Sequence, residues 1–375
     1  MIPPRFAHLA TKLFNVPLAL RPDRAEMVMA IVGERLGLRP IMRAGVESSA
    51  ASIVGQSATA SARPPGGDRH GPGYEVVEGV AIIQVHGLLV QRSGLLRPFY
   101  GITGMDGIRQ NVLEGLADPA VRAIMLSIDS PGGEVAGCFD LVDMIHASRG
   151  LKPIRAICAE HAYSAAYAIA SACDQVTVPR TGGTGSVGVI TLLVDWSRAL
   201  DGAGITVHFV HHGTRKAEEM RAELQGVSKD LLGRIQTEVD RVGELFVATV
   251  ARNRGVAAER IRDQQAACFM GELGVQQGLA DAVAAPSEAF EQFLSDLRRG
   301  AARAGRSARA ARRDPAPARN AASGQRSKTK APAPTPARDG VKRRSPTSRE
   351  ITPREEAQAL AAQVLAAAAK ARRGP

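Results

Sequence analysis

Ser164 is the residue of this sequence best placed for covalent chemistry. It follows the apolar run 153–158, which predicts a short buried strand, and it precedes an alanine-rich segment that predicts a helix packed on all sides. At such a junction, free backbone N–H groups and the helix dipole favour a developing negative charge. Ser164 is therefore either a nucleophile or a simple helix N-cap, because an N-cap uses the same residue type at the same place.

Gly132 and Gly133 form a second candidate element, in the run Asp129-Ser130-Pro131-Gly132-Gly133. They follow a predicted buried strand over 121–128 and precede a predicted helix over 134–149. Because they lack side chains, their backbone N–H groups can face an open site and hold an oxyanion. A tight turn is the alternative explanation of the same residues.

Lys216 and three histidines are the candidates for a general base. Lys216 follows a predicted strand over 205–210. If it is buried, desolvation favours its neutral form, which can accept a proton from a serine hydroxyl. His161, His211 and His212 are rivals for this role and would make a Ser-His-Asp enzyme.

The predicted elements place these residues in an α/β fold with a largely parallel sheet, because strands alternate with helices. Besides the segments already named, we expect strands over 80–85, 175–178 and 189–194, and helices over 107–116, 195–203 and 228–253. The glycine-rich loop 181–188, which contains Ser186, has neither the spacing nor the Lys-Ser or Lys-Thr ending of a phosphate-binding loop. The sequence therefore gives no support for nucleotide binding.

Composition divides the chain into five parts. We expect a helical N-terminal segment over 1–45, a flexible linker over 46–73 and a folded domain over 74–297. Residues 298–349 carry 16 lysines and arginines against 2 acidic residues, which predicts a disordered basic linker rich in Ala, Pro and Arg. Residues 350–375 begin with a capping-box pattern and predict a short helix, a possible docking element for scaffold or coat protein. The net charge of +11 therefore resides in the tail.

The cysteines and the apolar runs exclude several classes of protein. Cys138, Cys158, Cys173 and Cys268 have no CxxC spacing, so we expect small buried thiols in a reducing compartment and neither a zinc site nor disulfides. No apolar run has the length needed to span a bilayer, and the N-terminus lacks the pattern of a signal peptide. These features predict a soluble cytoplasmic protein without a membrane partner.

Taken in order, the motifs resemble the signal peptide peptidase A-like serine peptidases of family S49, and within them the lambda protein C-like head maturation proteases of phages. The resemblance runs from about Val80 to Val283. It rests on the segments 129–133, 163–167, 184–189, 213–216 and 278–281, on the opening 14–19, and on the interval between Ser164 and Lys216.

This resemblance implies a Clp/crotonase-type superhelix of ββα units and a serine endopeptidase with a Ser-Lys dyad. By position, Ser164 is the nucleophile, Lys216 the general base and Ser186 the side chain that orients the lysine. The N–H of Gly133, together with that of Ser164 or its neighbour, would form the oxyanion hole, and Gly132 shapes the turn. No cofactor and no metal are implied.

The resemblance also suggests the biological setting. The substrates would be capsid, scaffold or portal proteins of a phage or prophage, cleaved within assembling proheads in the bacterial cytoplasm, by a homo-oligomer. The basic tail could bind nucleic acid weakly through phosphates, although it lacks aromatic residues for stacking on bases. Two alternatives remain: a crotonase-fold acyl-CoA enzyme, and a non-catalytic head assembly or scaffold protein.

Overall fold

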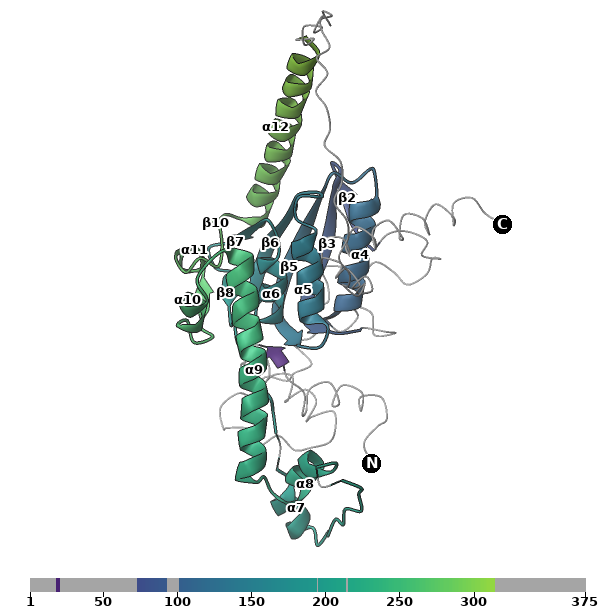
Figure 1. Ribbon diagram of the computed structural model, residues 1–375, viewed down its shortest axis with the longest axis vertical. Coiled ribbons are helices and arrows are strands. Elements are labelled where there is room, and N and C mark those ends of the chain that lie inside the picture. Colours follow the sequence, from purple (N-terminus) through teal and green to yellow (C-terminus); the bar gives the residue numbers. More distant parts are fainter. Residues whose placement is uncertain (1–17, 21–72, 93–100, 194, 214, 314–375) are drawn as a thin grey trace, which may run out of the picture. The chain divides into compact units, whose positions relative to one another are not determined.

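The computed structural model describes residues 18–20, 73–92, 101–193, 195–213 and 215–313 (Figure 1). These residues fall into two compact units, one that ends at Phe290 and one that begins at Glu291. The first unit contains the sheet and every candidate catalytic residue. The described part of the second unit belongs to helix α12 (Pro286–Arg313), which begins in the first.

A mostly parallel sheet organises the first unit. Its main order is β10-β7-β6-β5-β3-β2. The bounds are β2 Glu75–Val77, β3 Val80–Val90, β5 Ala123–Glu134, β6 Ile154–Tyr163, β7 Gln175–Val178 and β10 Ala282–Val283. Strands β3, β5, β6, β7 and β10 pair in parallel, while β2 pairs antiparallel with β3. β5 is buried along nearly its whole length, as expected for the centre of a parallel sheet.

Four short strands extend the sheet near the ends of β3, β5 and β6. β4 (Ile102–Gly104) pairs with β3, and β8 (Gly183–Gly185) pairs with both β6 and β9 (Cys268–Met270). β1 (Leu18–Leu20) pairs antiparallel with the last residues of β5 and is the purple arrow in Figure 1. Segments distant in sequence therefore meet at the ends of β5 and β6.

Helices α4 (Met105–Ala117), α5 (Cys138–Ala147) and α6 (Ala165–Ser171) cover one face of the sheet (Figure 1). All seven residues of α6 are buried, which agrees with its alanine-rich, uncharged sequence. The long helix α9 (Lys229–Arg254) packs against α5 and α6, where Phe246 makes an edge-to-face contact with Phe139. The hydroxyl of Ser228 caps α9 by accepting from the Leu231 N–H, and Gly255 ends it in the left-handed conformation.

The remaining helices are short. They are α7 (Ser197–Gly202), α8 (Glu218–Gln225), α10 (Ala258–Arg262) and α11 (Glu272–Gln276). Within the described part of the chain, no helix combines the length and the hydropathy that a membrane span requires.

The α/β class and the mostly parallel sheet are confirmed, and several expected elements agree closely. β7 has the predicted bounds, and α4 and α9 lie within a residue or two of theirs. β5 and β6 both continue beyond the predicted ends, because each pairs further along the sheet: β5 with β1 and β3, and β6 with β8. The predicted helix over 134–149 is shorter and begins at Cys138.

Two expected strands are absent from the described residues. The segment 205–210 is irregular and largely exposed, with Val210 fully exposed, so its apolar residues do not enter the sheet. In 189–193, Ile190 forms an isolated bridge with Leu18 and no ladder. Apolar alternation alone therefore did not identify sheet strands in this region.

The flanking segments also differ from expectation where they are described. Leu18–Leu20 is a strand within the stretch 1–45 expected to be helical. Residues 298–313 are helical in α12, because alanine and arginine favour helix and the first proline after Pro286 is Pro315. The rest of 1–45, nearly all of the linker 46–73 and residues 314–375 lie outside the described residues. Three cysteines are buried and unpaired as expected, but Cys268 is exposed.

Candidate active site

Ser164 lies at the turn between β6 and α6, as the sequence predicted. Its backbone has φ 53° and ψ −122°, a conformation that residues with a side chain rarely adopt. Such strain persists only where the surrounding structure enforces it, and it concentrates at functional sites. A serine on a strained strand-to-helix turn is also the arrangement that presents a nucleophile in α/β-hydrolases.

The hydrogen bonds of Ser164 argue against a simple helix cap. Its side chain makes no capping bond to α6. Instead, its Oγ donates to the carbonyl oxygen of Gly188 at 3.4 Å, a long contact, and its backbone N–H donates to the carbonyl oxygen of Gly185 at 2.9 Å. The hydroxyl is therefore held only weakly. Because the Ser164 N–H is already bonded, the neighbouring N–H of Ala165 is the better candidate for an oxyanion hole.

The glycine pair lies beside Ser164, within β5 rather than in a turn. Gly132 has φ 101°, and a Cβ atom on it would lie 3.0 Å from the Cβ of Ser164 and 3.1 Å from the backbone nitrogen of Ala165. A Cβ atom on Gly133 would lie 1.8 Å from the carbonyl oxygen of Leu89 on β3. Both positions thus require glycine, and Gly132 brings bare backbone to the start of α6.

Ser186 belongs to the segment that holds Ser164 in place. It is buried, has φ 53° and lies between the two residues whose carbonyl groups contact Ser164. Its backbone N–H donates to the carbonyl oxygen of Ala267 at 2.9 Å, which fixes this segment against the residues before β9. The structure therefore brings Ser164, Ser186, Gly132 and Gly133 together.

Lys216 is not part of this cluster in the structure. It lies in an exposed turn before α8, and no hydrogen bond or ion pair joins its side chain to Ser164 or Ser186 within the described residues. The assignment of Lys216 as the base stays a prediction. The expectation that a strand over 205–210 would deliver it to the sheet is wrong, because that strand is absent.

The three histidines are also placed elsewhere. His211 contacts the carbonyl oxygen of Gly213 through Nδ1 and a guanidinium nitrogen of Arg221 through Nε2, and His212 is exposed nearby. His161 lies on β6, where its ring stacks on that of Tyr163. Within the described residues, no hydrogen bond joins any of the three to Ser164.

Arg149 supports helix α6 from its C-terminal end, and it was not among the residues predicted from the sequence. Its guanidinium donates to the carbonyl oxygens of Ser171, Ala172, Cys173 and Asn253 at distances of 2.6–3.1 Å. Three of these carbonyl groups lie at the C-terminal end of α6, where the helix has no further backbone N–H groups to bond them. The signal in the sequence was an arginine at the C-terminal end of a predicted helix.

The closing motif 278–281 has a structural role. Arg254 of α9 forms a bidentate ion pair with Asp281 at 2.7 and 2.9 Å, and Asp281 also accepts from the Val176 N–H at 2.7 Å. Burial alone would raise the pKa of Asp281, but the hydrogen bonds from Arg254 and Val176 outweigh it and lower that pKa below its usual value. This pair ties α9 to β7 and β10.

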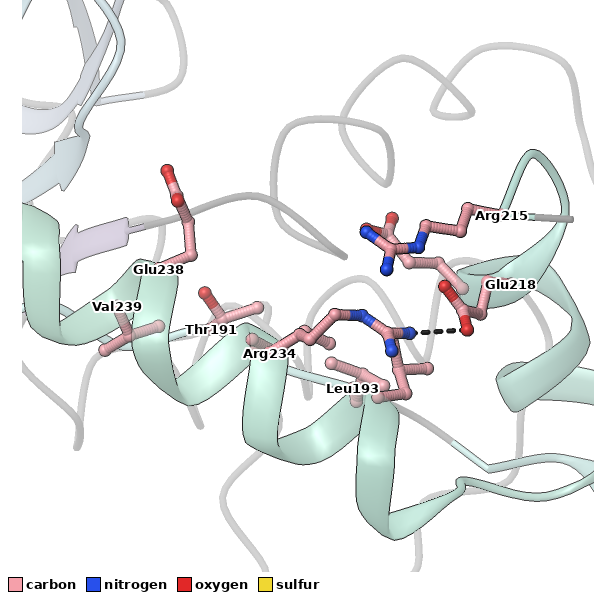
Figure 2. A pocket seen from close by; sticks show the side chains of 10 residues that line it. Thr191, Leu193, Arg215, Glu218, Arg234, Glu238 and Val239 are labelled. Carbon is pink, nitrogen blue, oxygen red and sulfur yellow. Dashed lines mark ion pairs between the residues drawn. The ribbon is translucent and has the colours of Figure 1, made fainter. Parts of the chain in front are cut away.

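A separate cavity of about 310 Å³ lies between α8 and the N-terminal half of α9 (Figure 2). Figure 2 shows Arg234 paired with Glu218 across it, while Arg215, the residue before Lys216, reaches in from above. Its lining contains none of Ser164, Ser186, Gly132 and Gly133. It is therefore distinct from the cluster around Ser164.

A serine on a strained strand-to-helix turn, beside the bare backbone of a glycine pair, is the arrangement expected of a serine hydrolase. Comparison with known proteins agrees: residues 146–297 match the model of peptidase family S49, and the chain is related to that family. The predicted resemblance is thereby confirmed.

Two of the relatives are phage proteins. The chain is 33% identical over 293 residues to head-tail preconnector protein GP5 of Enterobacteria phage P21, and 31% identical over 286 residues to capsid assembly protease C of Escherichia phage lambda. These alignments cover 78% and 76% of this chain, and 58% and 64% of the relatives. A cellular protein, the putative signal peptide peptidase SppA of Enterococcus faecium, is 25% identical over 48% of this chain and 52% of its own length.

Proposed function

We propose that this protein is a serine endopeptidase that acts on head proteins during assembly of a phage or prophage capsid. The observation that carries the proposal is the strained turn at Ser164 beside Gly132 and Gly133. The names of the two phage relatives support the setting, and the match to peptidase family S49 supports the reaction class. Capsid, scaffold and portal proteins are the proposed substrates.

The proposed reaction is acyl transfer. Neutral Lys216, oriented by Ser186, accepts the proton of the Ser164 hydroxyl as Ser164 attacks the peptide carbonyl. The backbone N–H groups of Gly133 and Ala165 stabilise the oxyanion. The protonated lysine then gives its proton to the leaving amine, and water hydrolyses the acyl-enzyme. This dyad requires the segment that carries Lys216 to approach Ser164.

The wider architecture proposed with this function follows the resemblance. It comprises a Clp/crotonase-type superhelix over 74–297, a disordered basic tail that begins after α12 and a short C-terminal helix over 350–375 that binds coat or scaffold protein. A homo-oligomer in the bacterial cytoplasm is part of the same proposal. Removal of residues 350–375 should then reduce co-assembly with coat protein without affecting peptidase activity.

The first test is the mass of the purified chain after incubation, alone and with coat and scaffold proteins. The wild type should cleave itself or a partner, while Ser164→Ala and Lys216→Ala should leave all chains intact. Ser197→Ala and Lys229→Ala change the same residue types at the starts of α7 and α9 and serve as matched controls. Cleavage by Ser164→Ala at the wild-type rate would exclude Ser164 as the nucleophile.

The pH dependence of the cleavage rate tests which residue is the general base. Because a lysine accepts a proton only when neutral, the rate should rise with pH across the mildly alkaline range. A rate that rises between pH 5 and 7 and is flat above would instead indicate a histidine base. The profile therefore separates Lys216 from His161, His211 and His212.

A further inference from the structure

Strand β1 lies directly against the proposed catalytic residues. Leu20 is in register with Gly132, Ala19 with Gly133 and Leu18 with Glu134, so β1 runs antiparallel to the end of β5. Figure 1 shows β1, the purple arrow, at the end of the sheet to which β5 runs. Three residues from the N-terminal region thus form an added strand on the wall made by the glycine pair.

The opposite edge of β1 is also paired. The N–H of Leu18 donates to the carbonyl oxygen of Ile190 at 2.8 Å, and the N–H of Ile190 donates to the carbonyl oxygen of Leu18 at 2.9 Å. Because successive residues of a strand direct their N–H and C=O groups to opposite sides, those of Ala19 face β5. β1 therefore occupies a groove whose two walls are β5 and Ile190, and it is bound by its backbone.

The carbonyl group of Ala19 lies beside the nucleophile. A Cβ atom on Gly132 would lie 2.2 Å from the carbonyl oxygen of Ala19 and 3.0 Å from the Cβ of Ser164. The same point lies 3.1 Å from the backbone nitrogen of Ala165, the candidate oxyanion donor. The carbonyl oxygen of Ala19 therefore lies against the side of Gly132 that faces Ser164 and Ala165, and Ser164 is fully buried.

We propose that strand β1 (Leu18–Leu20) occupies the peptide groove of the enzyme and is an internal competitor of the substrate. Substrates bind as an extended strand between Gly132–Glu134 and Ile190, by strand addition, and β1 must leave the groove first. A small side chain is required at the position of Ala19, which is buried in the core beside the glycines. This inference rests on the proposed function for its meaning, but its test does not depend on catalysis.

The test uses a reversible lock. Leu18 and Ile190 exchange two hydrogen bonds, and residues paired in this way have Cα atoms about 5.5 Å apart, within the range that a disulfide spans. Leu18→Cys with Ile190→Cys should therefore form a disulfide that retains β1 in the groove. The two single-cysteine variants are the matched controls, since they change the same side chains without the lock.

Binding is measured in a Ser164→Ala background with a fluorescein-labelled peptide of residues 14–24, by anisotropy. The reduced form should bind this peptide, and oxidation should weaken binding at least tenfold in the double variant only. Leu18→Pro, which removes the Leu18 N–H, should strengthen binding several-fold. A peptide carrying Ala19→Trp should bind at least tenfold more weakly than the unmodified peptide.

Equal binding by the oxidised and reduced double variant would overturn the proposal. So would the absence of binding by Leu18→Pro, in which the internal strand is released. If locking abolishes binding but no form with an intact Ser164 cleaves casein or a head protein, the groove assignment stands and the proposed peptidase function fails. If the enzyme cleaves casein, oxidation of the double variant should stop cleavage and reduction should restore it.

Discussion

Arg149 offers a sharp test of how helix α6 is held in place. Its guanidinium donates four hydrogen bonds, three to carbonyl groups at the end of α6 and one to the carbonyl of Asn253 in α9. A hydrogen bond from a charged donor contributes roughly 1.5–3 kcal/mol. The four are not additive, since water can reach part of the site after truncation. We therefore expect Arg149→Ala to lower the free energy of unfolding by about 3 kcal/mol.

The measurement is urea unfolding followed by circular dichroism. A loss of this size is a large fraction of the roughly 5–15 kcal/mol that stabilises a typical domain, and it should lower the melting temperature by roughly 6–12 °C. Arg149→Lys keeps the charge but not the fork of donors, so it should lose about half as much.

The matched control is Arg241→Ala. Among the described residues, Arg241 pairs only with Glu238, three residues away on α9, and the two side chains are 75% and 50% exposed. Such pairs contribute about 0.5 kcal/mol or less. If Arg149→Ala cost less than about 1 kcal/mol, close to the value for Arg241→Ala, the argument that the arginine completes the end of α6 would be refuted.

Two further predictions concern the residues around the site. Gly133→Ala should prevent normal folding or abolish activity, because its methyl group would collide with the Leu89 carbonyl. Gly107→Ala in α4 is the control: a Cβ atom there would have nothing within 4 Å, so this variant should be neutral or more stable by up to about 1 kcal/mol. Melting curves of both variants test this. The pKa of Asp281 is lowered in the folded state, so its ion pair with Arg254 contributes stability above the unfolded pKa near 4 and loses it as the pH falls through the lower folded value. Asp281→Asn should therefore destabilise the protein at pH 6 but much less near pH 3 in urea unfolding; a constant difference at both pH values would contradict the assignment.

The local sequence pattern predicted much of the sheet and the turn at Ser164. The apolar run before Ser164 and the alanines after it are enough to place a buried strand and helix, and β6 and α6 follow that prediction. The strained backbone of Ser164 could not be predicted in the same way, because it depends on the Gly185 carbonyl and other contacts from distant segments.

Long-range pairing explains most of the differences from prediction. β5 extends through Gly132 and Gly133 because β1 and β3 supply partners there, and a sequence window around these residues contains neither. The segment 205–210 has the composition of a strand, but no strand pairs with it among the described residues, and it remains largely exposed. Sequence composition thus predicted which segments are apolar, while the available partners determined which of them are strands.

The bare backbone at Gly132 and Gly133 has an evolutionary consequence. In the proposed groove, the backbone of Gly132 and Gly133 would recognise the main chain of a peptide. The carbonyl group of Leu89 leaves no room for a side chain at Gly133, so this wall cannot acquire one by substitution. Differences in substrate preference between related proteins would then arise on the opposite wall, around Ile190.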